Sequence, residues 1–503
     1  MENSKNLVNI TVNGEKRTVI KGTKISEIIA LDMLCGGHGK CGKCKVKAKG
    51  ALSALTDSEI LHLSQSEISD NVRLACFTEV LGECSIESVF KPQSENKILT
   101  EGVIADFALK PAFSKYGIAI DIGTTTLAAK LYNTKGETLA ESSILNPQSI
   151  FGADVVSRIE SALKGESQKI AEVIINGLDK LVNSLSEKSD IAVSQIDGAV
   201  ITGNTVMLHL LTNTSTEPLS HAPFKAERLF GETLTAAQLK FTSLKGDTQI
   251  YLPACISAFV GADTVCALTA TEICNTNSTK LLADIGTNGE IALWHNNVLT
   301  VCSTAAGPAF EGVGITMGMR GETGAIDRVT LDNGKLTTHV IGNTAPRGIC
   351  GSGIIDAVSC LLETEDIDET GFMEEDSVII SSPVIVTAKD IRAVQLAKSA
   401  ICAGINTVMK EFNISTEEIT ELFIAGGFGS YLNLESAGKI GLIPQSLVKK
   451  VTVTGNSALS GAAMMLLNSD FKAQSVELSK KAVVLELSSN PTFTNEYMEQ
   501  MMF

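Results

Sequence analysis

The chain has 503 residues, which is too long for one hydrophobic core, so we expect about two to four domains. Its net charge of −16 argues against nonspecific binding to nucleic acid or to an anionic membrane, because both require clustered lysine and arginine. The first residues lack the apolar core of a signal peptide, and no apolar run of about 18 residues would span a membrane. We therefore expect a soluble, cytoplasmic protein.

Three of the twelve cysteines follow the pattern C-x5-C-x2-C, and a fourth comes later in the chain. Four thiolates hold the [2Fe–2S] cluster of ferredoxins, whose plant-type spacing is C-x4-C-x2-C with a distant fourth cysteine. The segment that contains the first three cysteines also contains several glycines, which allow backbone amides to approach the sulfur atoms of a cluster. A zinc site or a group of buried thiols is the alternative, although a zinc ribbon usually has two C-x2-C pairs. The predicted cluster ligands are Cys35, Cys41, Cys44 and Cys76.

The region around these cysteines has the pattern of a small β-rich domain. Alternating residues predict strands at 7–12, 17–20 and 45–49, Thr23 is placed to cap a helix, and Thr56 to Glu59 forms a capping box. This order resembles the β-grasp fold of [2Fe–2S] ferredoxins, and the five-residue gap resembles the adrenodoxin-like branch. We assign residues 1–90 to this domain and 91–115 to a partly ordered linker, either a tether for electron transfer or only a boundary.

A different motif begins at Tyr116, where an apolar strand ends in an aspartate, a glycine turn and several threonines. The motif recurs after Lys280, again between two predicted strands. Backbone amides and hydroxyls in such turns can wrap phosphate oxygens, while the aspartate holds Mg²⁺ directly or through water. The candidate residues are Asp121, Gly123, Thr124, Thr125 and Thr126 in the first turn, and Asp284, Gly286, Thr287, Asn288 and Gly289 in the second.

A third turn, Gly426-Gly427, follows another apolar strand. Two Asp-Gly-Thr hairpins and a late diglycine turn resemble the actin/Hsp70/sugar-kinase ATPase superfamily, which has a two-lobed, ribonuclease-H-like α/β fold. The resemblance implies that the first two turns bind the phosphates of ATP with Mg²⁺ and that the diglycine turn contacts the adenosine. It places the lobes at 116–279 and 280–503, with scaffold helices at 153–163, 167–185, 388–412 and 458–467. The sequence lacks a P-loop motif and a Rossmann glycine turn.

Further glycine-rich segments accompany these turns: Asn146-Pro-Gln148 with 151–158, 203–209, 261–263, 306–312 and 348–356. Together with the cysteine loop they resemble a narrower family, the reductive activators of corrinoid proteins. These serve corrinoid-dependent methyltransferases, including O-demethylase systems of anaerobes. The resemblance implies ATP-dependent, one-electron reduction of a Co(II) corrinoid protein to Co(I) by the [2Fe–2S] cluster. It also implies a low-potential electron donor and a homodimer through the ATPase part.

Several polar residues of these segments have more than one interpretation. Asp263 is either a base that positions the attacking water or the cap of the following helix, and Glu311 is a candidate for holding Mg²⁺ or water. We treat both as candidate catalytic residues. Asn204 either caps the helix that carries His209 or contacts phosphate or a partner, while His209 is expected in the core. Cys350 is expected to be structural.

Three other functions remain open. An activator of another low-potential enzyme, of the 2-hydroxyacyl-CoA dehydratase type, shares the ATPase fold but bridges a [4Fe–4S] cluster between subunits and lacks a ferredoxin domain. A non-redox, ATP-driven reactivase or chaperone would exchange a damaged cofactor, and the cysteine set argues against it unless the iron is only structural. A small-molecule kinase with an appended ferredoxin would need a substrate pocket and a catalytic aspartate that the sequence does not identify.

Overall fold

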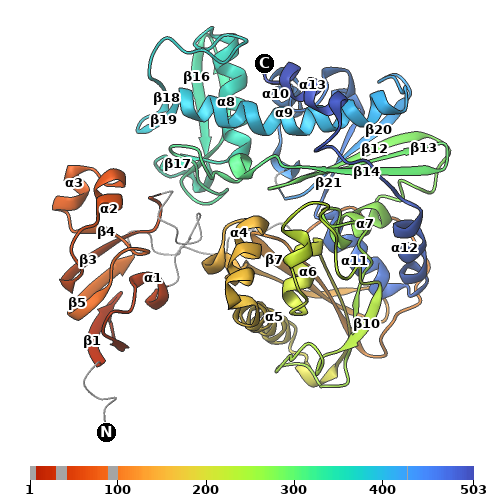
Figure 1. The fold of residues 1–503 in the computed structure, drawn as a ribbon, viewed down its shortest axis with the longest axis horizontal. Helices are drawn as coiled ribbons and strands as arrows, with labels where there is room; N and C mark the ends of the chain where they lie inside the picture. The colour runs from red at the N-terminus through yellow and green to blue at the C-terminus, as the bar shows by residue number, and fades with distance from the viewer. Residues whose placement is uncertain (1–6, 30–41, 89–99, 428) are drawn as a thin grey trace. The chain divides into compact units, whose positions relative to one another are not determined.

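The computed structural model describes residues 7–29, 42–88, 100–427 and 429–503. It divides into two compact units, one with Met1–Glu95 and Gln148–Ser161 and the other with Asn96–Pro147 and Ala162–Phe503 (Figure 1). Within the described ranges, no helix is both long enough and apolar enough to cross a membrane.

The first unit contains a five-stranded mixed sheet with the order β2-β1-β5-β3-β4. Strand β1 pairs antiparallel with β2 and parallel with β5, and β3 lies antiparallel to β4 and β5. The elements are β1 (Leu7–Val12), β2 (Glu15–Ile20), α1 (Ile25–Ile28), β3 (Lys45–Leu52), α2 (Asp57–His62), α3 (Gln65–Ser69), β4 (Val72–Leu74), β5 (Val80–Ser88) and α4 (Val155–Ser161). The sheet and its short helices form the β-grasp fold that the sequence predicts.

Local sequence signals explain much of this unit. Alternation along β1 buries Ile10 and Val12, and Asn13 adopts the positive φ of 49° that the hairpin turn requires. The capping box at α2 is confirmed, because Thr56 accepts a hydrogen bond from the Glu59 amide and Glu59 accepts one in return. The predicted cap of α1 is wrong: the N-cap is Lys24 rather than Thr23, and no side chain caps that one-turn helix.

The second unit contains two six-stranded sheets with the orders β10-β11-β9-β6-β7-β8 and β21-β20-β12-β13-β14-β22. Each has an antiparallel three-stranded meander whose first strand also pairs with a parallel strand from later in the chain. The first sheet comprises β6 (Tyr116–Ile122), β7 (Thr126–Asn133), β8 (Thr138–Leu145), β9 (Ile196–Gly203), β10 (Glu232–Thr235) and β11 (Gln249–Leu252). The second comprises β12 (Thr279–Ile285), β13 (Gly289–His295), β14 (Val298–Thr304), β20 (Ile419–Ala425), β21 (Val451–Gly455) and β22 (Val483–Val484).

This repeated topology gives the two Asp-Gly-Thr turns equivalent places. The first turn joins β6 to β7 and the second joins β12 to β13. Asp121 is paired in register with Ala128, and Asp284 is paired with Glu290. Both aspartates therefore lie near the carboxyl end of a central strand, which is where open α/β sheets bind ligands.

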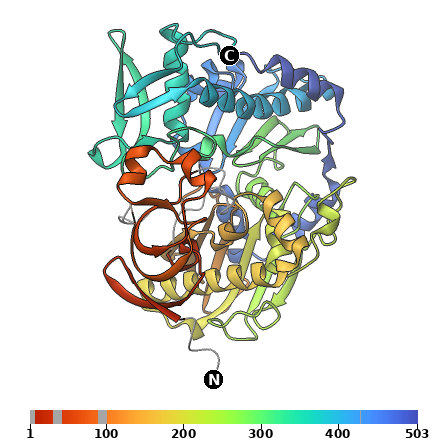
Figure 2. The same ribbon diagram turned by 60° about the vertical axis from the view of Figure 1, so that its left-hand side comes forward.

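Helices cover the sheets of the second unit. Figures 1 and 2 show the long helix α9 (Ala388–Glu411) along the sheet that contains β12, β13 and β14. Helices α7 (Ala262–Ala270) and α11 (Ser457–Leu467) pack so closely that a Cβ at Gly461 would lie 1.9 Å from the Cys266 carbonyl oxygen. This contact explains a glycine inside α11, where it otherwise weakens a helix.

The predicted scaffold helices are present with shifted ends. Helix α5 (Ser167–Ser189) continues beyond Leu185, and the helix expected at 153–163 is α4 followed by a π-helical turn at Ala162–Glu166, where Gly165 has a φ of 93°. The remaining helices of the second unit are α6 (Thr205–Leu211), α8 (Gly351–Glu363), α10 (Leu434–Lys439), α12 (Asp470–Lys481) and α13 (Pro491–Glu499). Two small sheets join β15 (Ala325–Asp332), β16 (Lys335–Val340) and β17 (Gly348–Ile349), and β18 (Ser377–Ser381) and β19 (Val384–Thr387).

Residues 100–112, which the sequence places in the linker, are bound to the second unit, and we call them the strap. Gly102 forms a bridge with Gly455, and Lys110 forms one with Asn468. The amides of Lys110 and Ala112 donate to the carbonyls of Leu467 and Leu466. The part of the predicted linker at 91–99 lies outside the described residues.

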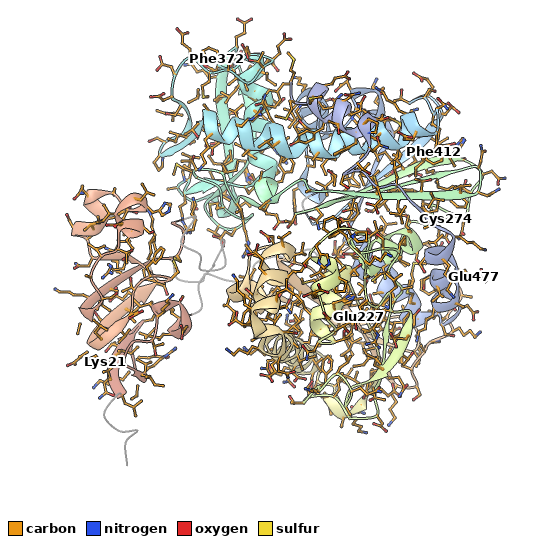
Figure 3. All side chains as sticks on the ribbon, viewed as in Figure 1. Lys21, Glu227, Cys274, Phe372, Phe412 and Glu477 are labelled. Carbon is orange, nitrogen blue, oxygen red and sulfur yellow. The ribbon has the colours of Figure 1, made fainter. Side chains whose placement is uncertain are left out.

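Large apolar side chains at the surface of the second unit are scattered. Phe372 and Phe412, which are 66% and 38% exposed, are both labelled in Figure 3 and come from different segments. Isolated exposed apolar residues of this kind are common and do not by themselves indicate a binding surface.

Candidate functional site

Two of the four predicted cluster ligands lie side by side. Cys44 directly precedes β3 and Cys76 closely follows β4, and the antiparallel pairing of Lys45 with Leu74 brings the two strands' ends together. Their sulfur atoms are 3.3 Å apart, too far for a disulfide bond, and both side chains are almost fully buried. Adjacent buried thiols suit ligation of one metal centre. Cys35 and Cys41 lie outside the described residues.

A buried carboxylate supports the segment that carries Cys76. Glu59 is fully buried and accepts hydrogen bonds from Arg73 Nε and Nη2, from the Leu74 amide and from the Thr78 hydroxyl. Burial raises the pKa of Glu59, but the bonds from Arg73 and from the backbone amides outweigh it and hold the pKa below its ordinary value. The capping box signalled Glu59 in the sequence, whereas nothing local signalled its pair with Arg73.

The first Asp-Gly-Thr turn is held by two asparagines. Asn146 donates from its amide to Thr125 O and from its side chain to Gly123 O. Asn204 donates to the Thr124 hydroxyl at 3.2 Å and also accepts from the Met207 amide, so the predicted helix cap is confirmed. The two asparagines thus hold the turn through two of its backbone carbonyls and one of its threonine hydroxyls.

The second turn meets the diglycine turn. Gly426 has a φ of 94°, and a Cβ there would lie 2.7 Å from Asp284 Oδ1, so only glycine fits beside this carboxylate. Gly427 has no atom within 4 Å of a Cβ position and faces open space. Gly289 is not among the lining residues of the pocket, and its Cβ position lies against Ile401 and Thr304, so close packing with α9 requires a glycine there; its place in the nucleotide site stays a prediction.

The three turns open into one pocket of about 640 Å³ in the second unit. Its wall contains eleven of the twelve residues predicted for the nucleotide and both predicted catalytic residues. They are Asp121, Gly123, Thr124, Thr125, Thr126, Asp284, Gly286, Thr287, Asn288, Gly426, Gly427, Asp263 and Glu311. The pocket thus brings together residues from distant parts of the sequence around a cavity of ligand size.

Six acidic residues line this pocket, and four of them, Asp121, Asp263, Asp284 and Glu290, interact through their charges. Burial, with a smaller contribution from neighbouring carboxylates, raises the pKa of Asp121 and of Asp284 to about 7, although the hydrogen bond from Asn456 lowers that of Asp121. Burial raises the pKa of Asp263 to about 6. Burial, Asp263 and Asp284 together raise the pKa of Glu290 well above its ordinary value. Such repulsion favours a bound cation. In the described part of the chain, no group of three or more acidic, histidine or cysteine side chains is arranged to hold a metal ion.

Asp263 does not cap α7. The helix has Gly261 as its N-cap, without a side-chain bond, and Asp263 lies within the first turn, where Oδ1 accepts from the Thr264 amide at 2.8 Å. The helix starts two residues earlier than it would if Asp263 were its N-cap, and Asp263 belongs to the pocket wall.

Glu311 joins the two phosphate-type turns. Its Oε2 accepts a hydrogen bond from the Thr125 hydroxyl at 2.6 Å, and its Oε1 accepts one from the Thr287 hydroxyl at 2.5 Å. The carboxylate therefore accepts hydrogen bonds from hydroxyls of both turns at the same time. An anionic ligand that used the same hydroxyls would have to displace it.

Sequence reasoning missed several residues of the pocket wall, among them Glu290, His339, Tyr431 and Asn456. Asn456 directly precedes a predicted helix, so its residue type could have indicated a cap, whereas His339, whose Nδ1 lies 2.6 Å from Asp327 Oδ1, had no local signal. Cys350, which was expected to be structural, is the N-cap residue of α8 and also lines the pocket. His209 is fully buried, with Nδ1 2.8 Å from Thr205 O, so its expected place in the core is confirmed.

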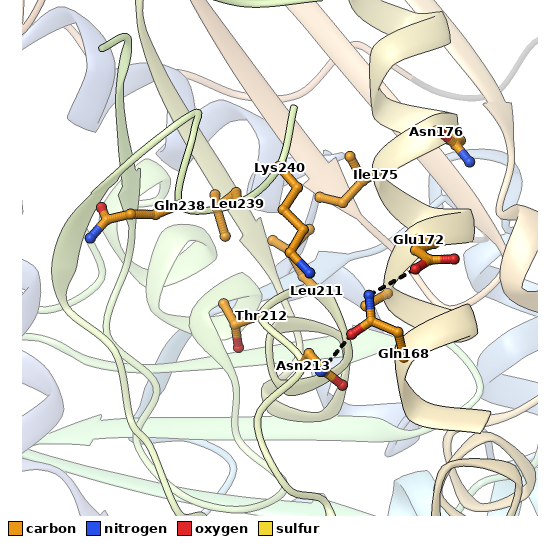
Figure 4. A pocket seen from close by; sticks show the side chains of 11 residues that line it. Gln168, Glu172, Ile175, Asn176, Leu211, Thr212, Asn213, Gln238, Leu239 and Lys240 are labelled. Atoms are coloured by element: carbon orange, nitrogen blue, oxygen red, sulfur yellow. Dashed lines mark hydrogen bonds between the residues drawn. The ribbon is translucent and has the colours of Figure 1, made fainter. Parts of the chain in front are cut away.

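A separate cavity of about 320 Å³ lies beside α5 and contains none of the predicted site residues. Figure 4 shows its amide-rich wall, where Gln168 is hydrogen-bonded to Asn213 and to Glu172. The charged residues among those that line this cavity are Glu172 and Lys240.

Comparisons with known proteins extend the match over nearly the whole chain. The model of the RACo middle region matches residues 116–276, and that of the C-terminal domain of RACo, the ASKHA domain, matches 278–503. The chain is 31% identical to the corrinoid activation enzyme RamQ of Eubacterium limosum, over 97% of this chain and 98% of that protein. It is 24% identical, over 77% of each chain, to the [Co(II) methylated amine-specific corrinoid protein] reductase of Methanosarcina barkeri.

A solved structure has the same fold over its full length. The reductive activator for corrinoid, iron-sulfur protein superposes with a TM-score of 0.71 and 26% sequence identity, covering 99% of this chain and 98% of that one. The predicted fold class, a β-grasp ferredoxin domain followed by a two-lobed ATPase fold, is confirmed by this match and by the two RACo models. With motifs, fold and relatives in agreement, the chain belongs to the family of reductive activators of corrinoid proteins.

Proposed function

We propose that this protein uses ATP to drive the reductive activation of a corrinoid protein. One electron passes from a reduced [2Fe–2S] centre to Co(II), which becomes Co(I), and a low-potential donor then returns one electron to the oxidised centre. The observation that carries the proposal is the presence, in one chain, of an adjacent pair of buried thiols and a pocket built from two Asp-Gly-Thr turns.

The residues of the first unit suit the iron–sulfur centre. Cys44 and Cys76 would provide two thiolates, and we assign Cys35 and Cys41 as the other two from their spacing. When bound, the cluster supplies one-electron reduction. Glu59 and Arg73 hold the backbone before Cys76, so the chain presents its sulfur atoms in a fixed arrangement.

The pocket of the second unit suits a nucleoside triphosphate with Mg²⁺. The hydroxyls of Thr125 and Thr287 would donate to phosphate oxygens, and the carboxylates of Asp121 and Asp284 would hold the cation directly or through water. Asp263, whose carboxylate faces the same pocket, is our candidate for positioning the attacking water. Gly427 leaves open space for the adenosine beside the diglycine turn.

ATP is needed because reduction of Co(II) to Co(I) requires a very low potential. For a one-electron step, a difference of about 59 mV changes the equilibrium constant tenfold, or about 1.4 kcal/mol. Nucleotide can supply this only by favouring a conformation in which transfer becomes favourable, for instance one that changes the ligands of cobalt in the partner. Two lobes around one pocket provide a structural basis for such a change.

The partner we propose is a corrinoid protein of a methyltransferase or O-demethylase system. This follows from the names of the relatives, since RamQ is a corrinoid activation enzyme and the Methanosarcina barkeri protein is a reductase of a corrinoid protein. A homodimer through the ATPase part, a cytoplasmic location and a separate low-potential donor complete the proposal.

The proposal is tested with the full chain after reconstitution of its cluster. Purified protein, reductant and MgATP are mixed with a Co(II) corrinoid protein, and cobalt is followed by its absorption spectrum. We expect Co(I) to accumulate with MgATP and not without nucleotide. If the corrinoid stays Co(II) under both conditions while the protein is reducible and binds MgATP, the proposal is wrong. A non-redox reactivase would instead exchange bound corrinoid without a change of cobalt oxidation state.

A further inference from the structure

The first residues of the strap are hydrogen-bonded to the segment that carries the pocket residue Asn456. The Val103 amide donates to Thr454 O at 2.9 Å, and the Asn456 amide donates to Glu101 O at 2.9 Å. These two bonds flank the antiparallel bridge between Gly102 and Gly455, at the end of strand β21 and just before α11 begins. The first described residues that follow the ferredoxin domain are therefore bound to the backbone of a pocket residue.

The side chain of Asn456 connects this backbone to the first Asp-Gly-Thr turn. Its Nδ2 donates to Asp121 Oδ2 at 3.0 Å, and its Oδ1 accepts from the Leu459 amide at 2.8 Å, which caps α11. One residue thus bonds the strap through its main chain, the helix through its carbonyl oxygen and the carboxylate of Asp121 through its amide group. Its position in the pocket wall places these bonds beside the ligand.

Close packing prevents the strap and Asn456 from moving independently. A Cβ at Gly102 would lie 2.5 Å from Asn456 O and 2.6 Å from Ser460 Oγ, so the strap touches the first turn of α11. Gly455 has a φ of 65°, and its Cβ position lies 2.4 Å from Glu101 O. A displacement of Asp121 that pulled on Asn456 would therefore change the strap as well.

We propose that Asn456 is a positioning residue, which holds Asp121 for the nucleotide and transmits the state of the nucleotide site to the strap, the segment through which the ferredoxin domain is attached. This inference rests on the proposed function for its nucleotide. When MgATP engages Asp121, the Asn456 amide shares that carboxylate with the cation, and the bonds at Glu101 and Thr454 respond. By linkage, a change in the strap alters nucleotide affinity by the same factor.

Two variants test the connection from its two ends. Asn456→Ser keeps a good N-cap for α11 but removes the donor to Asp121 without adding a charge beside it. Gly102→Ala leaves the Asn456 side chain unchanged and forces the strap away from α11. Lys110→Ala is the matched control, because it removes an exposed ion pair with Asp470 from the same strap at a distance from the pocket.

The measurements are MgATP affinity and hydrogen exchange of strap peptides, made on the full chain with and without MgATP. We expect MgATP to change exchange at Val103 and Asn456 in the natural chain. We expect Asn456→Ser to weaken MgATP binding by about tenfold or more and to remove that change in exchange. Gly102→Ala should shift the affinity about fivefold or more in either direction, and Lys110→Ala should leave it within about twofold.

Two results would overturn the inference: exchange in the strap that does not respond to bound MgATP, or a Gly102→Ala variant with unchanged affinity. A purely structural role for Asn456 would lower thermal stability but leave the nucleotide-dependent exchange intact, and this also contradicts it. Neither readout involves cobalt, so failure of corrinoid reduction alone would leave the coupling standing. A chain that does not bind MgATP would contradict both proposals.

Discussion

Glu311 provides the most direct test of how nucleotide enters the pocket. In the structure its two carboxylate oxygens hold the hydroxyls of Thr125 and Thr287, at 2.6 and 2.5 Å. Both hydroxyls belong to the turns assigned to phosphate. We predict that Glu311→Ala binds MgATP more tightly than the natural chain, because the phosphates no longer compete with a carboxylate for these donors.

The magnitude follows from the two hydrogen bonds. A bond to a charged group contributes about 1.5–3 kcal/mol to stability. When phosphate replaces Glu311, each hydroxyl exchanges one anionic acceptor for another. The net cost of displacing Glu311 is therefore that of about one such hydrogen bond. Its removal from the unliganded state should therefore increase affinity by about 10- to 100-fold. Repulsion between the displaced carboxylate and the phosphates acts in the same direction.

The assay is titration of MgATP by calorimetry or with a fluorescent analogue, together with single-turnover hydrolysis. Thr287→Val is the matched variant with the opposite expectation, because it removes a donor that phosphate would use and should weaken binding. An unchanged or weaker affinity in Glu311→Ala would refute the reasoning, since it would show that Glu311 stabilises the bound state. A faster or unchanged hydrolysis rate would also remove Glu311 from the candidate catalytic residues.

Three further predictions concern the remaining site residues. Cys76→Ser should lose bound iron without a change in MgATP affinity, whereas Cys84→Ser, at a buried cysteine outside the set, should keep its iron; iron analysis and nucleotide titration check this. Glu59→Gln leaves Arg73 buried without its anion and should destabilise the first unit by about 3–5 kcal/mol, measured as earlier thermal loss of cluster absorbance, while Glu67→Gln, in a partly exposed pair with Lys45, should change stability by less than about 1 kcal/mol. Burial raises the pKa of Asp263 to about 6, so the folded state binds more protons than the unfolded state between about pH 4 and 6. The free energy of unfolding of the nucleotide-free protein therefore decreases as the pH rises from about 4 to 6. Asp263→Asn should make urea denaturation less dependent on pH there, and an equally steep dependence would contradict this explanation.

The sequence by itself determined the features that depend on neighbouring residues. The spacing of Cys44 with its partners, the capping box at Thr56 and the two Asp-Gly-Thr turns were all predictable, because each is a local backbone requirement written in consecutive residues. The repeat of the Asp-Gly-Thr motif was enough to indicate two lobes, since each copy marks the same hairpin in the same topology. Family resemblance added the corrinoid partner.

The tertiary structure decided how these pieces meet. Asn456 reaches Asp121 across 335 positions of sequence, and Glu311 reaches Thr125 across 186. Gly289 looks like part of the second turn in the sequence but is required by the side chain of Ile401. Such contacts depend on how strands and helices pack, and no local pattern encodes that packing. For this reason the sequence identified the turns, whereas only the fold showed which residues hold them, link them and connect them to the strap.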